Sequence, residues 1–406
     1  MKKILLILLV ATVFLTGCDQ LNILTGGEDE SKEWQLMEES GKDTTVNFLY
    51  TRDDVQLRQW VRDHVEPALL ESHKVNIEFQ YVEFQSIISQ LRADKLGEQN
   101  YGDIDLLLLF DDELAQLKNE GLLFDDFNDK LPNYSKLMDS NDREVAFNYN
   151  TAIEKAGALF GRTQFIFVYD EDELENYPKN TEELLTFCQE NPGKFTYPLD
   201  EAGDVFIQNI IYDIVGEETL LSLDIKSKGF AEAMVPVKEY LAALKPLMWE
   251  KGEIQPMDTA ELDELFFDGK VFFSMSKELN HVLEQVENDK YLDGAKSFIF
   301  EKGTIGDASY LTIPYNSTNK TGAMIVVDQL LTPAIQKSKI NQEGYMSLPS
   351  IDLTRLDAEQ EEVFGAVPLK RAEFDINGLL TSRYPDLNKN MKRKIKELLG
   401  ISEMEQ

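Results

Sequence analysis

Apolar and polar residues alternate along the chain in blocks that predict an α/β architecture. From residue 46 onward the blocks follow the order strand, helix, strand, helix, strand, at 46–49, 54–70, 75–82, 85–96 and 105–110. The last block is a continuous apolar run bounded by charged residues, which is typical of a strand buried on both faces of a parallel sheet. This order predicts an α/β domain whose ligands bind beyond the carboxyl ends of its strands.

A second alternating region begins after an extended apolar segment at 157–169. Gly161 interrupts that segment, so we expect two short strands that cross from one domain to another. Helices are predicted at 181–189, 204–215, 230–249 and 259–267, with strands at 270–275 and 306–314 and a returning helix at 320–331. The first domain is therefore expected to be discontinuous. The predicted division is 45–160 for the first part of lobe 1, 161–305 for lobe 2 with a hinge strand, and 306–406 for the return to lobe 1 with the C-terminal helices.

The N-terminus carries the pattern of an export signal. Lys2 and Lys3 precede an apolar run at 4–15, which is shorter than the roughly 20 residues of a membrane-spanning helix. The run ends in Leu15-Thr16-Gly17-Cys18, which resembles the bacterial lipobox, in which the cysteine is diacylated and becomes the first mature residue. We therefore predict a lipoprotein signal peptide at 1–17 and lipid chains on Cys18 that hold the protein at the outer face of the bacterial cytoplasmic membrane. An ordinary secretory signal with an accidental cysteine is the alternative.

We predict that residues 18–44 form a lipidated tether. The stretch is polar and acidic, contains Gly26 and Gly27, and has little periodic apolar content. Trp34, Leu36 and Met37 predict a short helix that packs against the first domain.

The excess of acidic residues in the sequence argues against nucleic acid as a partner. The 406 residues include 40 Lys and Arg against 74 Asp and Glu, for a formal net charge of -34. Because nucleic-acid affinity comes mainly from Lys and Arg that displace counterions, we expect no nucleic-acid partner. Two cysteines, Cys18 and Cys188, and three histidines offer almost no material for a disulfide framework or a Cys/His zinc site. The length fits two or three domains, and we expect a monomer.

The sequence lacks the simplest signatures of catalysis. It contains no Gly-x-Ser-x-Gly, no Gly-rich phosphate loop ending in Gly-Lys-Ser/Thr and no His-Glu-x-x-His. The spacing of His64, His73 and His281 predicts no metal pair. Adjacent acids such as Asp111 and Asp112 suit acid–base chemistry, although acids in a first helical turn also cap backbone N–H groups. A surface-anchored hydrolase that uses a carboxylate pair therefore stays as an alternative, and no cofactor or metal is predicted.

Three stretches of the chain carry a family pattern. Phe195-Thr196-Tyr197-Pro198 is followed by Gly203-Asp204-Val205-Phe206-Ile207, and Leu244-Lys245-Pro246-Leu247-Met248-Trp249 comes later. The third stretch runs from 303 to 314 and continues through Asn316 to a helix that ends near Gln336. These stretches resemble one family of bacterial ABC-transporter solute-binding lipoproteins, some of whose members are described as thiamine-transport components. The resemblance spans nearly the whole mature chain. It implies a two-lobed periplasmic-binding-protein-like fold of type II with crossing hinge strands, which delivers a small solute to an ABC permease and ATPase and catalyses no reaction.

The resemblance and the predicted strand ends together give a set of candidate ligand-binding residues. Lobe 1 is expected to supply Tyr50, Thr51, Arg52, Asp111 and Asp112, and the crossings and lobe 2 to supply Gln164, Tyr197, Asp204, Ser276, Glu278, Asp307 and Tyr310. Relatives tend to have a Trp-Gly-Gly-Asp-like first loop, whereas this chain has Leu49-Tyr50-Thr51-Arg52, so the ligand of the relatives does not transfer directly. Structural roles are the alternative: Tyr197 in the core, Asp204 as an N-cap and Tyr310 as a hinge-packing residue.

The residue types in this set favour a positively charged ligand. Tyrosine faces and carboxylates bind a cationic heteroaromatic or an amine, such as thiamine, by stacking, cation–π attraction and charge pairing. Arg52 favours instead an anionic group on the ligand, provided that it faces the cleft. A sugar or a ferric ion is the alternative ligand, and a structural envelope lipoprotein without a ligand is the alternative class.

Overall fold

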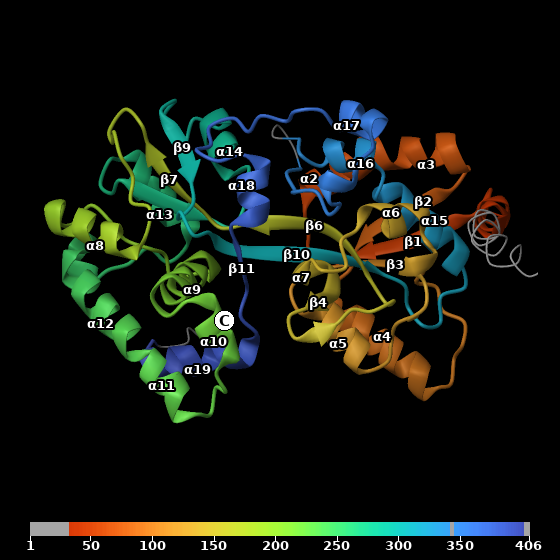
Figure 1. The fold of residues 1–406 in the computed structure, drawn as a ribbon, viewed down its shortest axis with the longest axis horizontal. Helices are drawn as coiled ribbons and strands as arrows, with labels where there is room; N and C mark the ends of the chain where they lie inside the picture. The colour runs from red at the N-terminus through yellow and green to blue at the C-terminus, as the bar shows by residue number, and fades with distance from the viewer. Residues whose placement is uncertain (1–31, 342–344, 402–406) are drawn as a thin grey trace, which may run out of the picture.

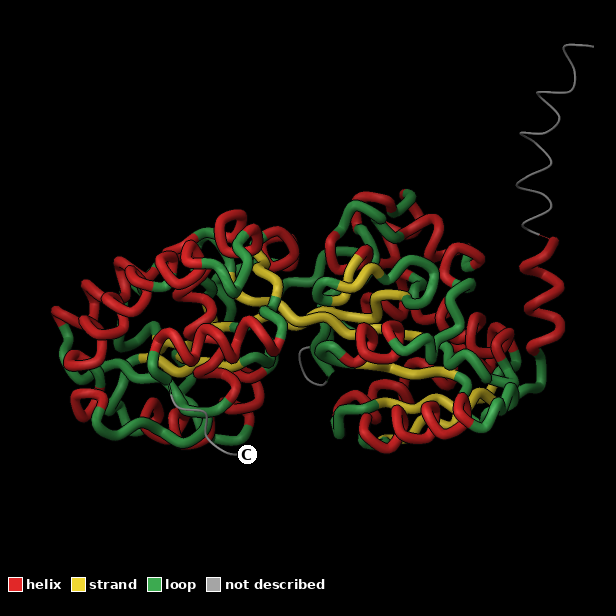
Figure 2. The backbone as a smooth tube through the Cα atoms, turned by 90° about the horizontal axis from the view of Figure 1, so that it is seen from below, coloured by secondary structure: helices red, strands yellow, loops and turns green. Residues whose placement is uncertain are grey.

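The chain folds into two lobes joined by long crossing strands, as a computed structural model that describes residues 32–341 and 345–401 shows (Figures 1 and 2). The predicted signal peptide and Cys18 lie outside the described residues. Within the described part of the chain, no helix has the length and apolar character needed to cross a membrane. The α/β two-lobed fold class predicted from the sequence is confirmed.

Lobe 1 is built on a six-stranded mixed sheet. The strands are β1 (Thr45–Tyr50), β2 (Asn76–Tyr81), β3 (Leu106–Leu109), β6 (Ala158–Gln164), β10 (Thr304–Thr312) and β11 (Arg383–Pro385). Strand β1 pairs in parallel with both β2 and β3, whereas β10 runs antiparallel to β3 and to β6. All four residues of β3 are buried, as its continuous apolar run predicts for a central strand.

Helices cover this sheet. They are α2 (Val55–Trp60), a π-helical turn at Val61–Val65, α3 (Glu66–His73), α4 (Phe84–Leu96), α5 (Glu113–Asn119), α6 (Pro132–Leu137), α7 (Arg143–Ala146), α15 (Lys320–Leu330) and α16 (Pro333–Ser338). The two-residue strands β4 (Phe147–Asn148) and β5 (Thr151–Ala152) form a small hairpin after α7. Residues 32–41 form a further helix, and its Trp34 and Met37 pack against the core of lobe 1 while Leu36 is exposed.

Lobe 2 has a smaller antiparallel sheet of β7 (Ile166–Asp170), β8 (Phe273–Ser276) and β9 (Ala295–Phe298), with β7 in the centre. Its helices are α8 (Thr181–Glu190), α9 (Glu201–Val215), α10 (Glu217–Ser222), α11 (Lys228–Ala233), α12 (Val235–Leu244), α13 (Thr259–Phe267), α14 (His281–Glu287), α18 (Ile376–Thr381) and α19 (Lys389–Leu399). Helix α17 (Ala358–Phe364) lies beside α16. The predicted helix at 230–249 is interrupted at two prolines. Pro236 lies in the first turn of α12, which separates this helix from α11, and Pro246 lies in the 3-10 turn that follows α12.

Two separate hydrophobic cores define the lobes. The core of lobe 1 is drawn from 46–160, 308–335 and Ile351, and that of lobe 2 from 165–305, 340–348 and 364–399. The C-terminal helices therefore pack on lobe 2, a lobe that the predicted division did not name for them. The amphipathic pattern of α19 fixes which face is buried but does not specify the lobe that receives it.

The hinge consists of β6 continuing into β7, together with β10 (Figure 1). Gly161 lies inside β6 rather than at the break that the sequence predicts, and the two strands separate at Phe165 instead. A third connection comes from β11, which pairs in parallel with the first residues of β10. The lobes are thus joined at the hinge by three strands from distant parts of the sequence.

Candidate functional site

Strand register brings three charged residues together between the lobes. Strands β1 and β3 are parallel neighbours, so the loops after their carboxyl ends place Arg52 and Asp111 at one edge of the sheet. Tyr310 of β10 lies opposite Leu109 in an antiparallel pair, so Asp307, three residues earlier in β10, lies beyond the end of β3. The site therefore forms where the α/β topology predicts a ligand.

These residues border a small cavity between the lobes, which we call the hinge cavity. Its chemically informative lining residues are Arg52, Asp54, Phe110, Glu278, Asp307 and Tyr345. The cavity volume is about 50 Å³, far below the roughly 300–1,000 Å³ of a pocket that encloses a drug-sized ligand. A solute of the size of thiamine therefore requires the lobes to separate further.

Arg52 lies over the aromatic ring of Phe110, with its guanidinium carbon 4.3 Å from the ring centroid. One Nη atom is 3.6 Å from Oδ2 of Asp111 and 3.6 Å from Oδ2 of Asp307. Burial opposes the charge of Arg52, but the carboxylates of Asp307 and Asp111 outweigh it and raise the pKa of this residue. Arg52 is therefore a cation at any ordinary pH.

Asp307 is the most strongly perturbed carboxylate of the hinge cavity. Its side chain is only 12% exposed. Burial raises the pKa of Asp307 to about 6, and the negative charge of Asp111 adds to this effect, whereas Lys277 and Arg52 oppose it. Titration of this carboxylate therefore falls close to neutral pH, at a point where both lobes meet.

Lys277 supplies a second cation near Asp307. Its Nζ donates to Oε1 of Glu201 at 2.5 Å, and its carbonyl oxygen accepts a hydrogen bond from Thr163 Oγ1 at 2.7 Å. Burial lowers the pKa of Lys277, but Asp307 and Glu201 raise it by more. The sequence analysis missed this residue, although it lies between two predicted site residues, Ser276 and Glu278.

Thr51 holds the first loop in place. Its hydroxyl donates to Oε2 of Glu113 at 2.5 Å, and the same oxygen accepts the backbone N–H of Phe110 at 3.0 Å. Burial raises the pKa of Glu113 to about 7, against these two hydrogen bonds. Thr51 therefore acts on the site by joining the ends of β1 and β3.

Three predicted site residues lie inside the protein instead of facing the hinge cavity. Tyr50 is fully buried and stacks on Phe79 with ring centroids 4.2 Å apart. Tyr310 is buried, and its hydroxyl donates to the carbonyl of Phe147 at 3.3 Å. Gln164 is fully buried in the hinge, where its amide donates to the carbonyl oxygen of Ser382 at 2.6 Å. These side chains belong to the buried scaffold, and none of the three lines the hinge cavity.

The remaining predicted residues lie around the cavity rather than at its centre. Lys389 of lobe 2 reaches Oδ1 of Asp112 at 3.1 Å, and Asp204 accepts from Lys396 at 2.6 Å. Ser276 Oγ accepts the backbone N–H of Glu278 at 3.0 Å. Asp204 is not the N-cap of α9, since Asp200 takes that role through the N–H groups of Ala202 and Gly203.

Tyr197 packs on Phe206 of lobe 2, with ring centroids 4.9 Å apart. Burial raises the pKa of its hydroxyl. The core role that the sequence left as its alternative therefore matches the contacts of Tyr197.

Hydrogen bonds and ion pairs connect the two lobes directly. Tyr149 donates to Oδ2 of Asp386 at 3.0 Å, and Asn280, the residue before α14, donates to Oε1 of Gln56 at 3.0 Å. Together with the Asp112–Lys389 pair, these contacts hold the described conformation with the lobes touching.

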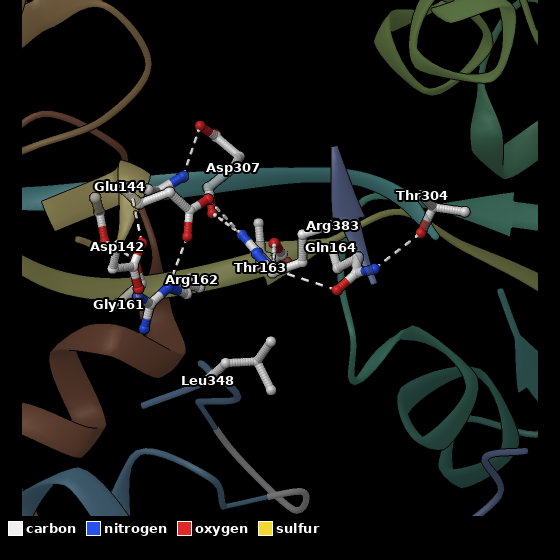
Figure 3. A network of polar contacts seen from close by, with 12 residues as sticks. Asp142, Glu144, Gly161, Arg162, Thr163, Gln164, Thr304, Asp307, Leu348 and Arg383 are labelled. Atoms are coloured by element: carbon white, nitrogen blue, oxygen red, sulfur yellow. Dashed lines mark hydrogen bonds and ion pairs between the residues drawn. The ribbon is translucent and has the colours of Figure 1, made fainter. Parts of the chain in front are cut away.

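Behind the cavity, Glu144 bridges two arginines of the hinge (Figure 3). Its Oε2 accepts from Nε of Arg162 at 2.6 Å, and its Oε1 accepts from Nη2 of Arg383 at 2.8 Å. Asp307 pairs with Thr163 across the strands and Arg162 pairs with Ala308, so Arg162 and Asp307 project from opposite faces of the hinge. The guanidinium of Arg162 is therefore committed to this network and not to a ligand.

Two small hollows beside Asp307, of about 40 Å³ and about 10 Å³, are lined by the predicted residues Tyr310 and Gln164 respectively, whereas two larger hollows in the described part of the chain contain none of the predicted set. One of about 810 Å³ lies between the helix at 32–41 and α6, and one of about 410 Å³ lies beside the Glu144 network. None of the described residues that line either hollow belongs to the predicted set. Among the described residues, no group of three or more His, Cys, Asp or Glu side chains is placed to hold a metal ion.

The sequence analysis also missed Phe110, Asp54 and Tyr345 as cavity residues. Phe110 directly precedes the predicted residue Asp111, and Asp54 lies two residues after the predicted residue Arg52. Tyr345 comes from a distant loop with no local pattern, and its ring packs near Trp60 at 5.5 Å between centroids.

Comparisons with known proteins agree with this geometry. The profile of the family described as bacterial extracellular solute-binding proteins matches residues 68–357. Protein YnjB of Escherichia coli (strain K12) is 24% identical over 343 residues, which are 83% of this chain and 88% of that protein.

Solved structures share the fold at low sequence identity. An ABC transporter protein from Clostridium perfringens ATCC 13124 superimposes with a TM-score of 0.58 at 17% identity, over 88% of this chain and 98% of the other. The cyclic alpha-maltosyl-1,6-maltose binding protein from Arthrobacter globiformis gives 0.61 at 13% identity, over 88% and 94%. The Bordetella ferric binding protein gives 0.58 at 14% identity, over 87% and 98%. With its two lobes, its crossing hinge strands and the family match over most of its length, this chain belongs to the bacterial extracellular solute-binding proteins.

Proposed function

We propose that this protein captures a small organic cation between its two lobes and delivers it to an ABC importer. Solute-binding proteins of this family bind small solutes outside the cytoplasm and work with an ABC permease and ATPase. Membership of a binding-protein family also weighs against the carboxylate-dependent hydrolase that the sequence left open.

The excess of carboxylates around the hinge cavity is the main support for a positively charged ligand. Asp54, Glu278 and Asp307 line it, and Asp111 lies 3.6 Å from the guanidinium of Arg52. Two cations, Arg52 and Lys277, thus lie near four carboxylates, and the guanidinium of Arg162 is already bonded to Glu144, so the carboxylates still outnumber the cations. An additional positive charge on a ligand would restore the balance.

The aromatic side chains of the cavity support a flat or quaternary cation. Phe110 already accepts the guanidinium of Arg52 on its ring face, which is the geometry of a cation–π contact. Tyr345 also lines the cavity. Thiamine, a cationic heteroaromatic molecule, meets both requirements and is our first candidate.

Two similar proteins suggest the competing ligands. The Arthrobacter protein is described as a binder of a maltose derivative, and the Bordetella protein as a binder of ferric ion. A sugar is neutral and would leave the carboxylates uncompensated. A ferric ion would compensate them, but it needs several ligands that converge at one point, and no such group of His, Cys, Asp or Glu side chains is found among the described residues.

The test is a thermal-shift screen of the purified protein with thiamine, polyamines, quaternary amines, sugars and ferric ion. Ligand at a hundredfold excess over its dissociation constant stabilises the folded protein by about 2.7 kcal/mol, which corresponds to several degrees of melting temperature. We expect a cation to give the largest shift and Asp307→Asn to reduce it. The matched control is Asp126→Asn, which removes an exposed carboxylate paired with Lys130. A clear shift with a sugar or ferric ion, and none with any cation, would refute the ligand class.

A further inference from the structure

We infer that Arg52 is an internal competitor for the ligand: its guanidinium occupies the place where the positively charged group of the solute binds, and the solute displaces it. This inference rests on the proposed function. The charge of Arg52 also explains how a site with so many carboxylates stays folded when no ligand is bound. The place itself is defined by the contacts of Arg52.

The partners of Arg52 are those that a small organic cation requires. Its guanidinium lies 4.3 Å above the ring of Phe110, and one Nη atom is 3.6 Å from a carboxylate oxygen of both Asp111 and Asp307. An aromatic face with two carboxylates beside it is a general recognition element for amines, amidines and quaternary nitrogen.

Arg52 is held loosely in this position. Charge-assisted hydrogen bonds span about 2.7–2.9 Å, so its two contacts at 3.6 Å are ion pairs without close hydrogen bonds. The guanidinium donates no hydrogen bond within this distance to another residue that the structure describes, and its side chain remains 34% exposed. By contrast, Arg162 behind the hinge donates to Glu144 at 2.6 Å and is 5% exposed. Arg162 is thus a structural arginine, whereas Arg52 is attracted by charge and stacking alone.

The backbone around Arg52 permits an exchange. β1 ends at Tyr50, and α2 begins at Val55 with Asp54 as its N-cap, accepting the N–H of Leu57 at 2.8 Å. Arg52 therefore lies in a short connection outside both elements, and its side chain can leave the cavity without breaking a helix or strand hydrogen bond. Its departure would take one cation away from Asp111 and Asp307, which an incoming solute would replace, while Lys277 stays near Asp307.

The opposite role for Arg52 is to bind an anionic group of the solute. In that case a ligand would approach the guanidinium with a carboxylate or phosphate, and removal of Arg52 would weaken binding. The 3.6 Å contacts to two existing carboxylates favour displacement, because an incoming anion would have to face both of them.

Methylguanidinium is the probe, because it reproduces the charged end of Arg52 and requires no knowledge of the natural solute. The full-length mature protein is compared with Arg52→Ala by calorimetric titration and melting temperature. We expect methylguanidinium to bind Arg52→Ala at least tenfold more tightly than the wild type. Arg58→Ala is the control, since Arg58 donates to Tyr50 Oη and pairs with Asp53 outside the cavity. It should behave like the wild type, and adding Asp307→Asn to Arg52→Ala should abolish the gain. Arg52→Gln serves as a second variant should Arg52→Ala fold poorly.

Equal affinity of methylguanidinium for the wild type and both Arg52 variants would overturn the inference. A second arm uses the organic cation that gives the largest shift in the wild-type screen: tighter binding to Arg52→Gln supports displacement, and weaker binding shows that Arg52 holds an anionic group and overturns it. If the wild type binds no organic cation in the screen but Arg52→Ala gains methylguanidinium binding, the proposed ligand class fails while the cation-binding place stands.

Discussion

Asp307 illustrates how one buried carboxylate links stability to ligand binding. Its pKa is raised to about 6 mainly by burial, so the folded protein holds a proton at pH values where the unfolded chain has released it. Between about pH 4 and pH 6 the folded state therefore binds more protons than the unfolded state, and the free energy of unfolding falls as pH rises through this window. Above it, the ionised carboxylate destabilises the empty protein and is available to a cation.

Asp307→Asn should therefore stabilise the ligand-free protein at pH 7.5 and abolish much of this pH dependence. A pKa raised by about two units corresponds to at most roughly 3 kcal/mol, and the gain should shrink towards zero near pH 4. Differential scanning calorimetry from pH 4 to 8 measures it, with Asp126→Asn as the exposed control. Identical pH profiles for the wild type and Asp307→Asn would show that this carboxylate is not the perturbed group.

At the residue scale, the sequence predicted where the site residues lie in the fold better than it predicted the direction in which their side chains point. Arg52, Glu278 and Asp307 were placed at strand ends and crossings, and they do line the hinge cavity. Tyr50 and Tyr310 belong to the same elements but are buried. Successive side chains of a strand point to opposite faces, and a strand end that is apolar on both sides gives no sign of which face meets the ligand. Tyr345 was missed because it reaches the cavity through tertiary packing alone.

At the element scale, the Glu144 network connects strands of the hinge to each other. Burial raises the pKa of Glu144, but the guanidinium groups of Arg383 and Arg162 outweigh it and hold this pKa below its usual value. Arg162 and Arg383 belong to β6 and β11, so one carboxylate from α7 ties two of the three hinge strands to lobe 1. This contribution to stability is present at neutral pH and is lost as pH falls through the lowered pKa.

Glu144→Gln should therefore destabilise the protein by about 3 kcal/mol, because it leaves two buried arginines without their shared counter-charge. Chemical denaturation followed by circular dichroism gives the difference. Glu217→Gln is the matched control, as it removes an exposed pair with Arg143 that is worth at most about 1 kcal/mol. A Glu144→Gln variant no less stable than Glu217→Gln would contradict this role for the network.

The sequence predicted extended structure at 157–169 and a strand at 306–314, which overlap β6, β7 and β10, but it placed a break at Gly161, inside β6. It did not predict β11, which has three residues and is defined by its pairing with β10 and not by a pattern of its own. It also named no lobe for the C-terminal helices, which pack on lobe 2, because amphipathicity predicts that a face is buried but not which core buries it.

At the scale of the whole molecule, the small hinge cavity implies movement of the lobes. A cavity of about 50 Å³ encloses no solute of thiamine size, so binding requires opening followed by closure around the ligand. Because the lobes already touch in the described conformation, small-angle scattering of protein saturated with ligand should give a larger radius of gyration than this conformation has. A radius equal to that of the described conformation, with a verified bound ligand, would count against hinge opening.

The location of the protein gives a further prediction, which concerns a residue outside the described part of the chain. If Cys18 carries the lipid, Cys18→Ser should abolish acyl labelling and release the protein from the membrane fraction. A labelled, membrane-bound Cys18→Ser variant would rule out the lipobox interpretation.

The central claim is that the cleft between the lobes binds a small organic cation. Native mass spectrometry of protein gently purified from its own host, without added ligand, tests it most directly. We predict a bound species whose accurate mass and fragmentation identify a cationic organic molecule such as thiamine, present in the wild type and in Asp126→Asn and strongly reduced in Asp307→Asn. A co-purifying sugar or iron species, or an organic ligand retained equally by Asp307→Asn, would contradict the account.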